Sequence, residues 1–243
     1  MFFVTLFALG VLSGATAAVA GFGIGSLLTP LLATALGTPT AIAAVAIPHA
    51  AATALRFWRL RPAVDWSVIR TFGLLSATGG LAGALAYARL SGRALTVALG
   101  LLLVATAVAG ITGWSARWRA TGATAAGLGL LSGFFGGVVG NQGGLRAAAL
   151  LGVGLSPSAY VATATAIALM VDAVRTPIYV WRAGPVLAGV ATPILVATVG
   201  VLIGTLLGER VLLGLGVERF RRIVSALIGA LGVWLLVSGA QAS

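Results

Sequence analysis

The stretch Gly21-Phe22-Gly23-Ile24-Gly25, with Pro30 shortly after it, interrupts an apolar run near the start of the chain. A second interruption, Gly140-Asn141-Gln142-Gly143-Gly144, lies in the second half. Glycine weakens a helix interior, and clustered glycines favour a break. We therefore predict a broken helix in each half of the chain.

The sequence around the two breaks is repeated. Residues 9–56 align without a gap on residues 128–175, which places Leu-Gly-x-Leu-Ser-Gly on itself and Arg56 on Arg175. An internal repeat with a helix break at the same point is typical of transporters. We predict one transmembrane domain over 1–243, built from internal repeats at 1–115 and 120–243.

The composition is that of an integral membrane protein. Of 243 residues, 60% are hydrophobic and 8% are charged, against about 25% charged in ordinary soluble domains. Apolar runs of about 20 residues recur along the chain, and each can cross the hydrocarbon layer as a helix. Strand-like alternation is absent, which predicts an all-α polytopic fold. The first twenty residues could pass for a signal peptide, but they have no basic start and a repeat partner lies in mid-chain, so we assign them to the fold.

The apolar runs predict about eight full spans, or ten segments when the half-helices are counted. The first half has segments at about 2–20, 26–36, 40–57, 66–87 and 94–112, and the second at 122–139, 145–155, 158–180, 185–207 and 220–238. Gly79, Gly80 and Gly83 suit close helix packing. An interfacial turn is expected over 209–222.

The arginines favour five segments in each half. All 15 basic residues are arginine, and the net charge is +11. With four crossings per half, the two sides carry similar numbers of arginines, seven against six, whereas with five segments ten lie on one face against three on the other. Those three are Arg89, Arg93 and Arg182. The positive-inside rule then places both termini outside the cytoplasm. An odd number of segments also makes the repeats inverted.

The charge balance and the missing residue types limit the possible functions. We read the arginines as setting topology and contacting anionic lipid headgroups, and we expect no nucleic-acid partner. The chain has no cysteine, one histidine and four acids, Asp65, Asp172, Glu209 and Glu218. This set leaves little for a metal site or an acid–base enzyme. We expect no cofactor and no metal.

The breaks are the candidate ligand site. Freed N–H groups and the positive end of a half-helix point at one spot there, an arrangement suited to an anion. The predicted binding residues are Gly21, Gly23, Gly25, Gly140, Asn141, Gln142, Gly143, Gly144, Arg146 and Arg175. A helix kink or a close helix crossing is the alternative role for the glycines.

The charged candidates each have a structural alternative. Arg146 either binds the substrate, extends to a membrane interface, or only offsets a structural acid. Arg175 and Asp172, three residues apart on one helical face, can form a structural ion pair. His49 and Asp172 are candidates for proton coupling, although His49 is equally explained as a neutral histidine bonded within the bundle.

The motifs resemble a known family. Gly21-x-Gly23-x-Gly25-Ser26-Leu27-Leu28-x-Pro30-x-Leu32, together with Leu131 to Gly137 and Gly140-x-x-Gly143-Gly144, is similar to the TauE/SafE family of sulfite exporters and related permeases. The resemblance covers essentially the whole chain. It implies a permease of the bacterial inner membrane for sulfite, sulfonates or related organosulfur anions. The second motif departs from the family pattern at Asn141-Gln142, at Arg146 and at Ala149.

We therefore expect a transporter for a small anion. The substrate would lie near the midplane of the membrane, between the two breaks. The sequence is also compatible with a homo-oligomer. Two alternatives come from other classes: a membrane-embedded enzyme acting on lipid, and a non-transporting membrane subunit whose glycines serve packing alone. The sparse acids disfavour the first, and the intramembrane arginines disfavour the second.

Overall fold

The structure, a computed structural model, describes residues 1–21, 23–113, 122–151, 153–212 and 217–241. Every regular element in these ranges is helical. Among the helices of these ranges, seven are long and apolar enough to cross a membrane. The predicted all-α polytopic membrane fold is confirmed. The junction around residues 114–121 and part of the expected interfacial turn, residues 213–216, lie outside the described residues.

The first half contains three long helices, one half-helix and one composite span. Its elements are α1 (Phe2–Ala20), α2 (Ile24–Leu36), α3 (Thr38–Leu60), η1 (Arg61–Ala63), α4 (Trp66–Val68), η2 (Ile69–Gly73), α5 (Leu74–Tyr87) and α6 (Gly92–Thr112). Asp65 caps α4 by accepting hydrogen bonds from the Ser67 and Val68 amides. A further bond from the Ser67 hydroxyl is the main cause that lowers the pKa of this carboxyl.

The second half repeats this order. Its elements are α8 (Gly122–Val139), α9 (Gly143–Leu151), α10 (Pro157–Gly189), α11 (Ala191–Leu212) and α12 (Val217–Gln241). The boundary predicted between 180 and 185 is wrong, because α10 continues to Gly189 through Pro177 and Pro185. Proline is tolerated in membrane helices where neighbouring groups satisfy the freed carbonyl, so the turn-like sequence around Arg182 does not end the helix.

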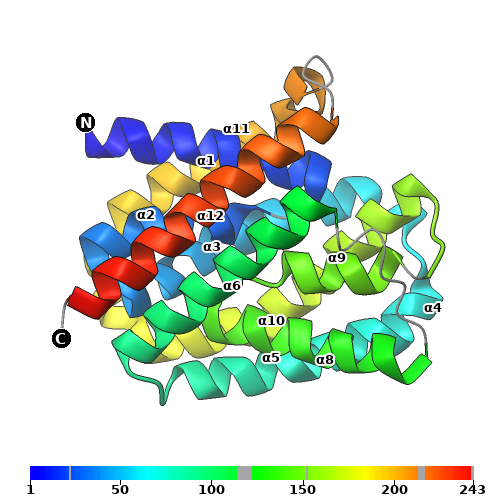
Figure 1. Cartoon of the computed structure of the whole chain (residues 1–243), viewed down its shortest axis with the longest axis horizontal. Helices are drawn as coiled ribbons and strands as arrows, with labels where there is room; N and C mark the ends of the chain where they lie inside the picture. The colour runs from blue at the N-terminus through cyan, green and yellow to red at the C-terminus, as the bar shows by residue number, and fades with distance from the viewer. Residues whose placement is uncertain (22, 114–121, 152, 213–216, 242–243) are drawn as a thin grey trace.

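Helix α1 packs against α11, and α5 packs against α8 (Figure 1). Glycines lie at both contacts. A Cβ at Gly14 would collide with the Val201 carbonyl, and one at Gly133 would collide with the Ser76 carbonyl. Gly79 and Gly83 are equally constrained by the α8 backbone. Larger side chains would force these helices apart. The expected packing role of these glycines is confirmed.

The chain reverses direction at the second break. Helix α8 runs parallel to α5, because Gly133 lies against Ser76 and Gly137 against Gly80. Helix α5 also runs parallel to α10, because Gly73 lies near Met170 while Arg182 bonds the Ala88 carbonyl. Helices α8 and α10 are therefore parallel. The half-helix α9 between them must return toward the side from which α8 came.

Helices at equivalent positions in the two halves cross in opposite directions. On α3 and α10, His49 contacts Asp172 and Arg56 contacts Thr165. Residue numbers increase along α3 where they decrease along α10, so the two helices are antiparallel. On α6 and α12, Gly100 lies near Gly232 and Gly110 near Ser225. Two equivalent antiparallel spans require a two-fold axis in the membrane plane.

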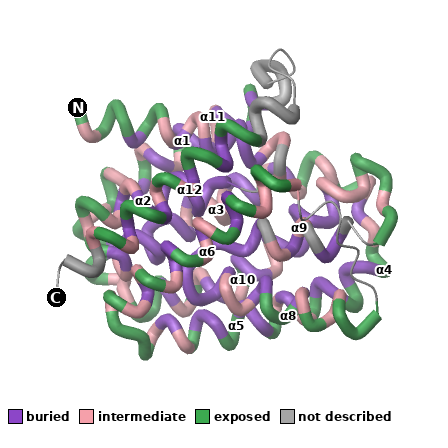
Figure 2. The backbone as a smooth tube through the Cα atoms, in the orientation of Figure 1, coloured by how far each residue is buried: buried purple, intermediate pink, exposed green. Residues whose placement is uncertain are grey.

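This arrangement supports the five-segment interpretation and the inverted repeats. The α1–α11 packing has its counterpart in α8–α5, and α3–α11 has its counterpart in α10–α5. Both termini lie at the same end of the bundle (Figure 1). Buried residues follow the central helices α3 and α10, whereas exposed residues cover the outer helices (Figure 2). The fold therefore places the inner faces of α3 and α10 at the centre of the bundle.

Candidate functional site

The two helix breaks meet each other. Gly21, Gly23 and Gly140 all have positive φ, a conformation that favours glycine. A Cβ added to Gly25 would collide with the Gly140 carbonyl. Tertiary contact therefore joins two breaks that are far apart in the sequence.

Polar groups at the second break are buried without partners. Asn141 and Gln142 are each 4% exposed. The Ser132 hydroxyl donates to the Gln142 carbonyl at 3.0 Å, but the Asn141 Nδ2, Gln142 Nε2 and Gln142 Oε1 atoms have no protein partner. Leaving a buried polar group unbonded costs about 1–3 kcal/mol. These amides are therefore positioned to bond something other than the protein.

The first break contributes two hydroxyl groups that are also buried without a hydrogen-bond partner. Ser26 lies in the first turn of α2 and Thr29 one turn later, and both are buried. Neither hydroxyl oxygen has a hydrogen-bond partner in the structure. Ser26 follows Gly25, the residue that touches the second break. The first break thus adds a further donor or acceptor beside the amides.

Arg146 lies in the first turns of α9 and joins the breaks. The side chain is buried, with the residue 3% exposed. Its Nη2 donates to the Gly21 carbonyl at 3.3 Å, whereas its Nη1 has no partner. No ion pair within the described ranges involves Arg146. A buried cation is costly unless an anion compensates it, so the expectation that Arg146 extends to a membrane interface does not fit its burial.

Arg175 is bonded on all sides to protein groups. Its Nε donates to Asp172 Oδ1 at 2.9 Å and its Nη2 lies 2.8 Å from the same oxygen. Its Nη1 donates to the Gly136 carbonyl at 2.7 Å. The predicted Asp172–Arg175 pair is confirmed as a contact. The bond from Arg175 to the Gly136 carbonyl joins α10 to α8 one turn before the second break.

His49 joins the same network from α3. Its Nδ1 lies 2.7 Å from Asp172 Oδ2, and Thr53 donates to the His49 carbonyl at 2.6 Å. His49 and Asp172 are 123 positions apart, so their contact could not be predicted from local sequence. The candidates for proton coupling therefore form one hydrogen-bonded pair, which equally fits the alternative of a histidine bonded within the bundle.

Arg56 does not share the surroundings of its repeat partner Arg175. Its Nη2 donates to the Thr165 hydroxyl at 2.9 Å. It also lines a small cavity with Ala18 and Thr205, near the α1–α11 contact. The two arginines therefore bond different helices, Arg56 to α10 and Arg175 to α8.

The buried charges around the two breaks are unbalanced. Arg146 and Arg175 are buried cations there, whereas Asp172 is the buried acid that pairs with Arg175. The interior therefore carries an excess of positive charge around the breaks. An anion that enters the site would offset it.

Two tyrosines missed by the sequence reasoning separate this network from one end of the bundle. The Tyr179 hydroxyl donates to the Gly137 carbonyl, and the Tyr87 hydroxyl donates to the Pro39 carbonyl. Their ring centroids are 4.6 Å apart. Tyr179 lies one helical turn after Arg175, and this spacing was the available signal. Tyr87 also lines a cavity of about 280 Å³ that opens beside Arg182.

A second cavity lies near the other side of the site. It has a volume of about 300 Å³ and is lined by Val19, Leu150, Leu155, Pro157, Tyr160 and Val161. This cavity lies at the start of α10, whereas the cavity beside Tyr87 lies at the start of α3. Because α3 and α10 are antiparallel, the two cavities lie toward opposite ends of the bundle.

Comparison with known proteins gives one family. The family model described as sulfite exporter TauE/SafE matches residues 6–235. The curated proteins and the solved structures gave no match. The matched range contains both breaks and all the buried charged residues.

Proposed function

The chain belongs to the sulfite exporter TauE/SafE family, and we propose that it carries sulfite or a closely related sulfur oxyanion across the membrane. The family is one of membrane permeases for sulfur anions, and the polytopic fold agrees with that role. We also propose that the protein lies in a bacterial inner membrane and that the substrate binds where the two helix breaks meet.

The observation that carries the proposal is the set of unpartnered donors where the breaks meet. Arg146 Nη1, Asn141 Nδ2 and Gln142 Nε2 are buried and unbonded. Hydrogen bonds between such donors and a charged oxygen are each worth about 1.5–3 kcal/mol. Sulfite presents three oxygens on one small centre. A small oxyanion therefore fits both the charge and the number of free donors.

Glycine backbone completes the proposed site. Gly21, Gly23 and Gly140 adopt the positive φ of the turns, Gly25 lets the two breaks approach each other, and Gly143 and Gly144 begin α9. The start of α9 directs its positive end toward the second break. Arg175 contributes by holding Gly136 in place, since its nitrogens already have protein partners. We therefore assign it a positioning role.

Energetics favour export as the simplest mode. An inside-negative potential drives an anion outward by about 2.3 kcal/mol per charge per 100 mV. Uptake would instead need a coupled ion, and the His49–Asp172 pair is the proposed place for a proton. Access would alternate by motion of one bundle against the other around the fixed breaks.

The alternatives receive less support. Within the described ranges no group of three His, Cys, Asp or Glu residues could hold a metal ion, so nothing there favours a metal-dependent membrane enzyme. A subunit that only packs would not need buried amides and a buried guanidinium without partners. We therefore retain the transporter proposal.

Flux into proteoliposomes tests the proposal. Radiolabelled sulfite, sulfate, taurine and acetate are compared in vesicles with the protein and in empty vesicles. We expect protein-dependent flux of sulfite above that of acetate. No protein-dependent flux of any of the anions would refute the transporter function.

A substitution at the break then tests the site. Gln142→Leu removes an amide whose side chain has no protein partner, so the fold should be retained while the KM for sulfite rises. Thr205→Val is the control, because it removes a buried hydroxyl without a partner that lies on α11 and not in either break. An unchanged KM in Gln142→Leu would refute the assignment of this residue to the site.

A further inference from the structure

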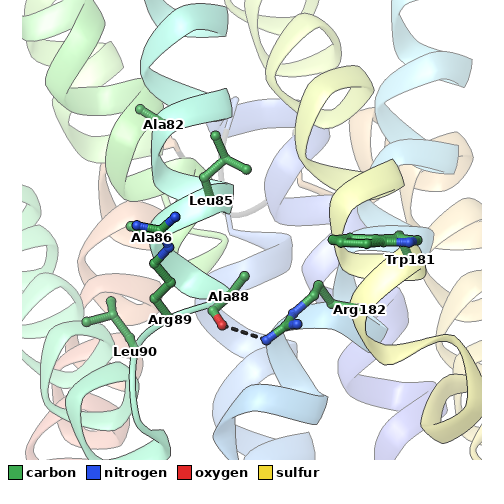
Figure 3. A pocket seen from close by; sticks show the side chains of 8 residues that line it. All are labelled: Ala82, Leu85, Ala86, Ala88, Arg89, Leu90, Trp181 and Arg182. Carbon is green, nitrogen blue, oxygen red and sulfur yellow. Dashed lines mark hydrogen bonds between the residues drawn. The ribbon is translucent and has the colours of Figure 1, made fainter.

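A groove of about 740 Å³ lies on the outer surface between α10 and the end of α5. Its walls include Ala82, Leu85, Arg89, Leu90, Trp181 and Arg182, shown in Figure 3. Trp181 and Arg182 project from α10 toward α5 in this view. The groove is separate from the helix breaks and plays no part in the proposed transport site.

The polarity of the groove changes along its length. Ala82 and Leu85 lie within the apolar span, and Leu85 is 53% exposed. Arg89 lies beyond the last residue of α5, at the end of that span. The groove is therefore apolar toward the membrane interior and basic at the membrane boundary. This order matches an amphiphile with its headgroup at the interface.

The basic end of the groove has a defined geometry. Arg182 Nη2 donates to the Ala88 carbonyl at 2.9 Å, which holds the guanidinium at the end of α5 (Figure 3). Arg89 lines the same groove from the turn that follows α5. Within the described part of the chain no ion pair involves either arginine. Two cations thus lie at the membrane boundary with no acidic side chain to balance them.

We propose that this groove binds an anionic phospholipid. Its phosphodiester would lie between Arg89 and Arg182, and one acyl chain would follow Ala82, Leu85 and the Trp181 ring. A soluble phosphate would use the arginines but not the apolar wall. Trp181 is 79% exposed, and tryptophan is typical of the membrane interface, where its indole meets headgroups.

Lipid binding to the detergent-purified protein tests this proposal. Phosphatidylglycerol and phosphatidylcholine with the same acyl chains are titrated, and binding is followed by native mass spectrometry. We expect tighter binding of phosphatidylglycerol, and roughly a five-fold loss of this preference for each arginine removed in Arg89→Gln and Arg182→Gln. Arg93→Gln is the matched control, since Arg93 is exposed at the same end of the bundle but does not line the groove.

Two further measurements distinguish a bound phospholipid from a bound soluble phosphate. Leu85→Trp fills the apolar wall and keeps both arginines, so it should weaken the lipid without altering the charge. Glycerol phosphate, which has the head chemistry but no acyl chain, should not compete at equal concentration. Equal preference for phosphatidylglycerol in wild type and Arg89→Gln would overturn the proposal, as would full competition by glycerol phosphate. Arg89→Gln leaves the Arg182–Ala88 bond intact, so it tests the site even if Arg182→Gln does not fold.

Discussion

Replacing Arg146 with glutamine should weaken sulfite transport without weakening the fold. The guanidinium is buried, its Nη1 has no partner, and its one hydrogen bond in the structure runs to the Gly21 carbonyl at 3.3 Å. Glutamine keeps a donor for that carbonyl while removing the charge. The substitution therefore separates anion binding from the contact between the breaks.

The magnitude follows from the lost charged hydrogen bond. Such a bond is worth about 1.5–3 kcal/mol, which corresponds to about a 10- to 150-fold loss of affinity. Arg146→Lys retains the charge but not the planar pair of donors, so it should fall between glutamine and wild type. The assay is sulfite flux into proteoliposomes over a range of concentrations.

Thermal unfolding distinguishes this role from a structural one. If Arg146 awaits an anion, the empty Arg146→Gln protein loses an uncompensated buried cation and should be at least as stable as wild type. Sulfite at about 100 times its Kd should add about 2.7 kcal/mol to wild type, and much less to the variant at the same concentration. Arg70→Gln, an exposed arginine, is the control. A clear loss of stability in the empty variant together with an unchanged KM would refute the assignment.

Three further predictions concern the fold. Asp172→Asn should lower the free energy of unfolding by about 3–5 kcal/mol, because it leaves Arg175 buried without its carboxylate; thermal unfolding in detergent measures this. Gly137→Leu should prevent α8 from packing on α5, because even a Cβ there would collide with the α5 backbone, and size-exclusion chromatography would show aggregation. Single cysteines at Leu90 and Ser156 should label from opposite sides of the membrane.

Each of these predictions has a clear contrary result. Wild-type stability of Asp172→Asn would mean that the buried pair contributes nothing to the fold. Gly127→Leu is the control for helix packing, since no atom lies within 4 Å of a Cβ at that position; equal aggregation of both variants would contradict the packing argument. Labelling of both cysteines from one side would contradict five segments in each half and favour four. The chain contains no cysteine, so the wild type serves as the unlabelled background.

The local features of the fold could be read from the sequence. Apolar runs longer than the hydrocarbon layer predict membrane helices, and α1 and α8 have the predicted bounds. Glycines predict breaks because they adopt positive φ, as Gly21 and Gly140 do. Asp172 and Arg175 were expected to pair because residues three apart share a helical face. The end of α10 was missed because proline and glycine near Arg182 also occur inside membrane helices.

The sequence by itself determined the class of the protein and the places where its helices break, because hydrophobic length and glycine conformation act over a few neighbouring residues. Only the tertiary structure decided which distant groups meet. It brought Gly25 against Gly140, joined His49 to Asp172, and placed Tyr87 on Tyr179. It also set the contacts of two repeat-equivalent arginines: Arg175 bonds Gly136 on α8, whereas Arg56 bonds Thr165 on α10. Such pairings depend on helix directions and crossing points, which the packing of the whole bundle sets and which no short stretch of sequence encodes.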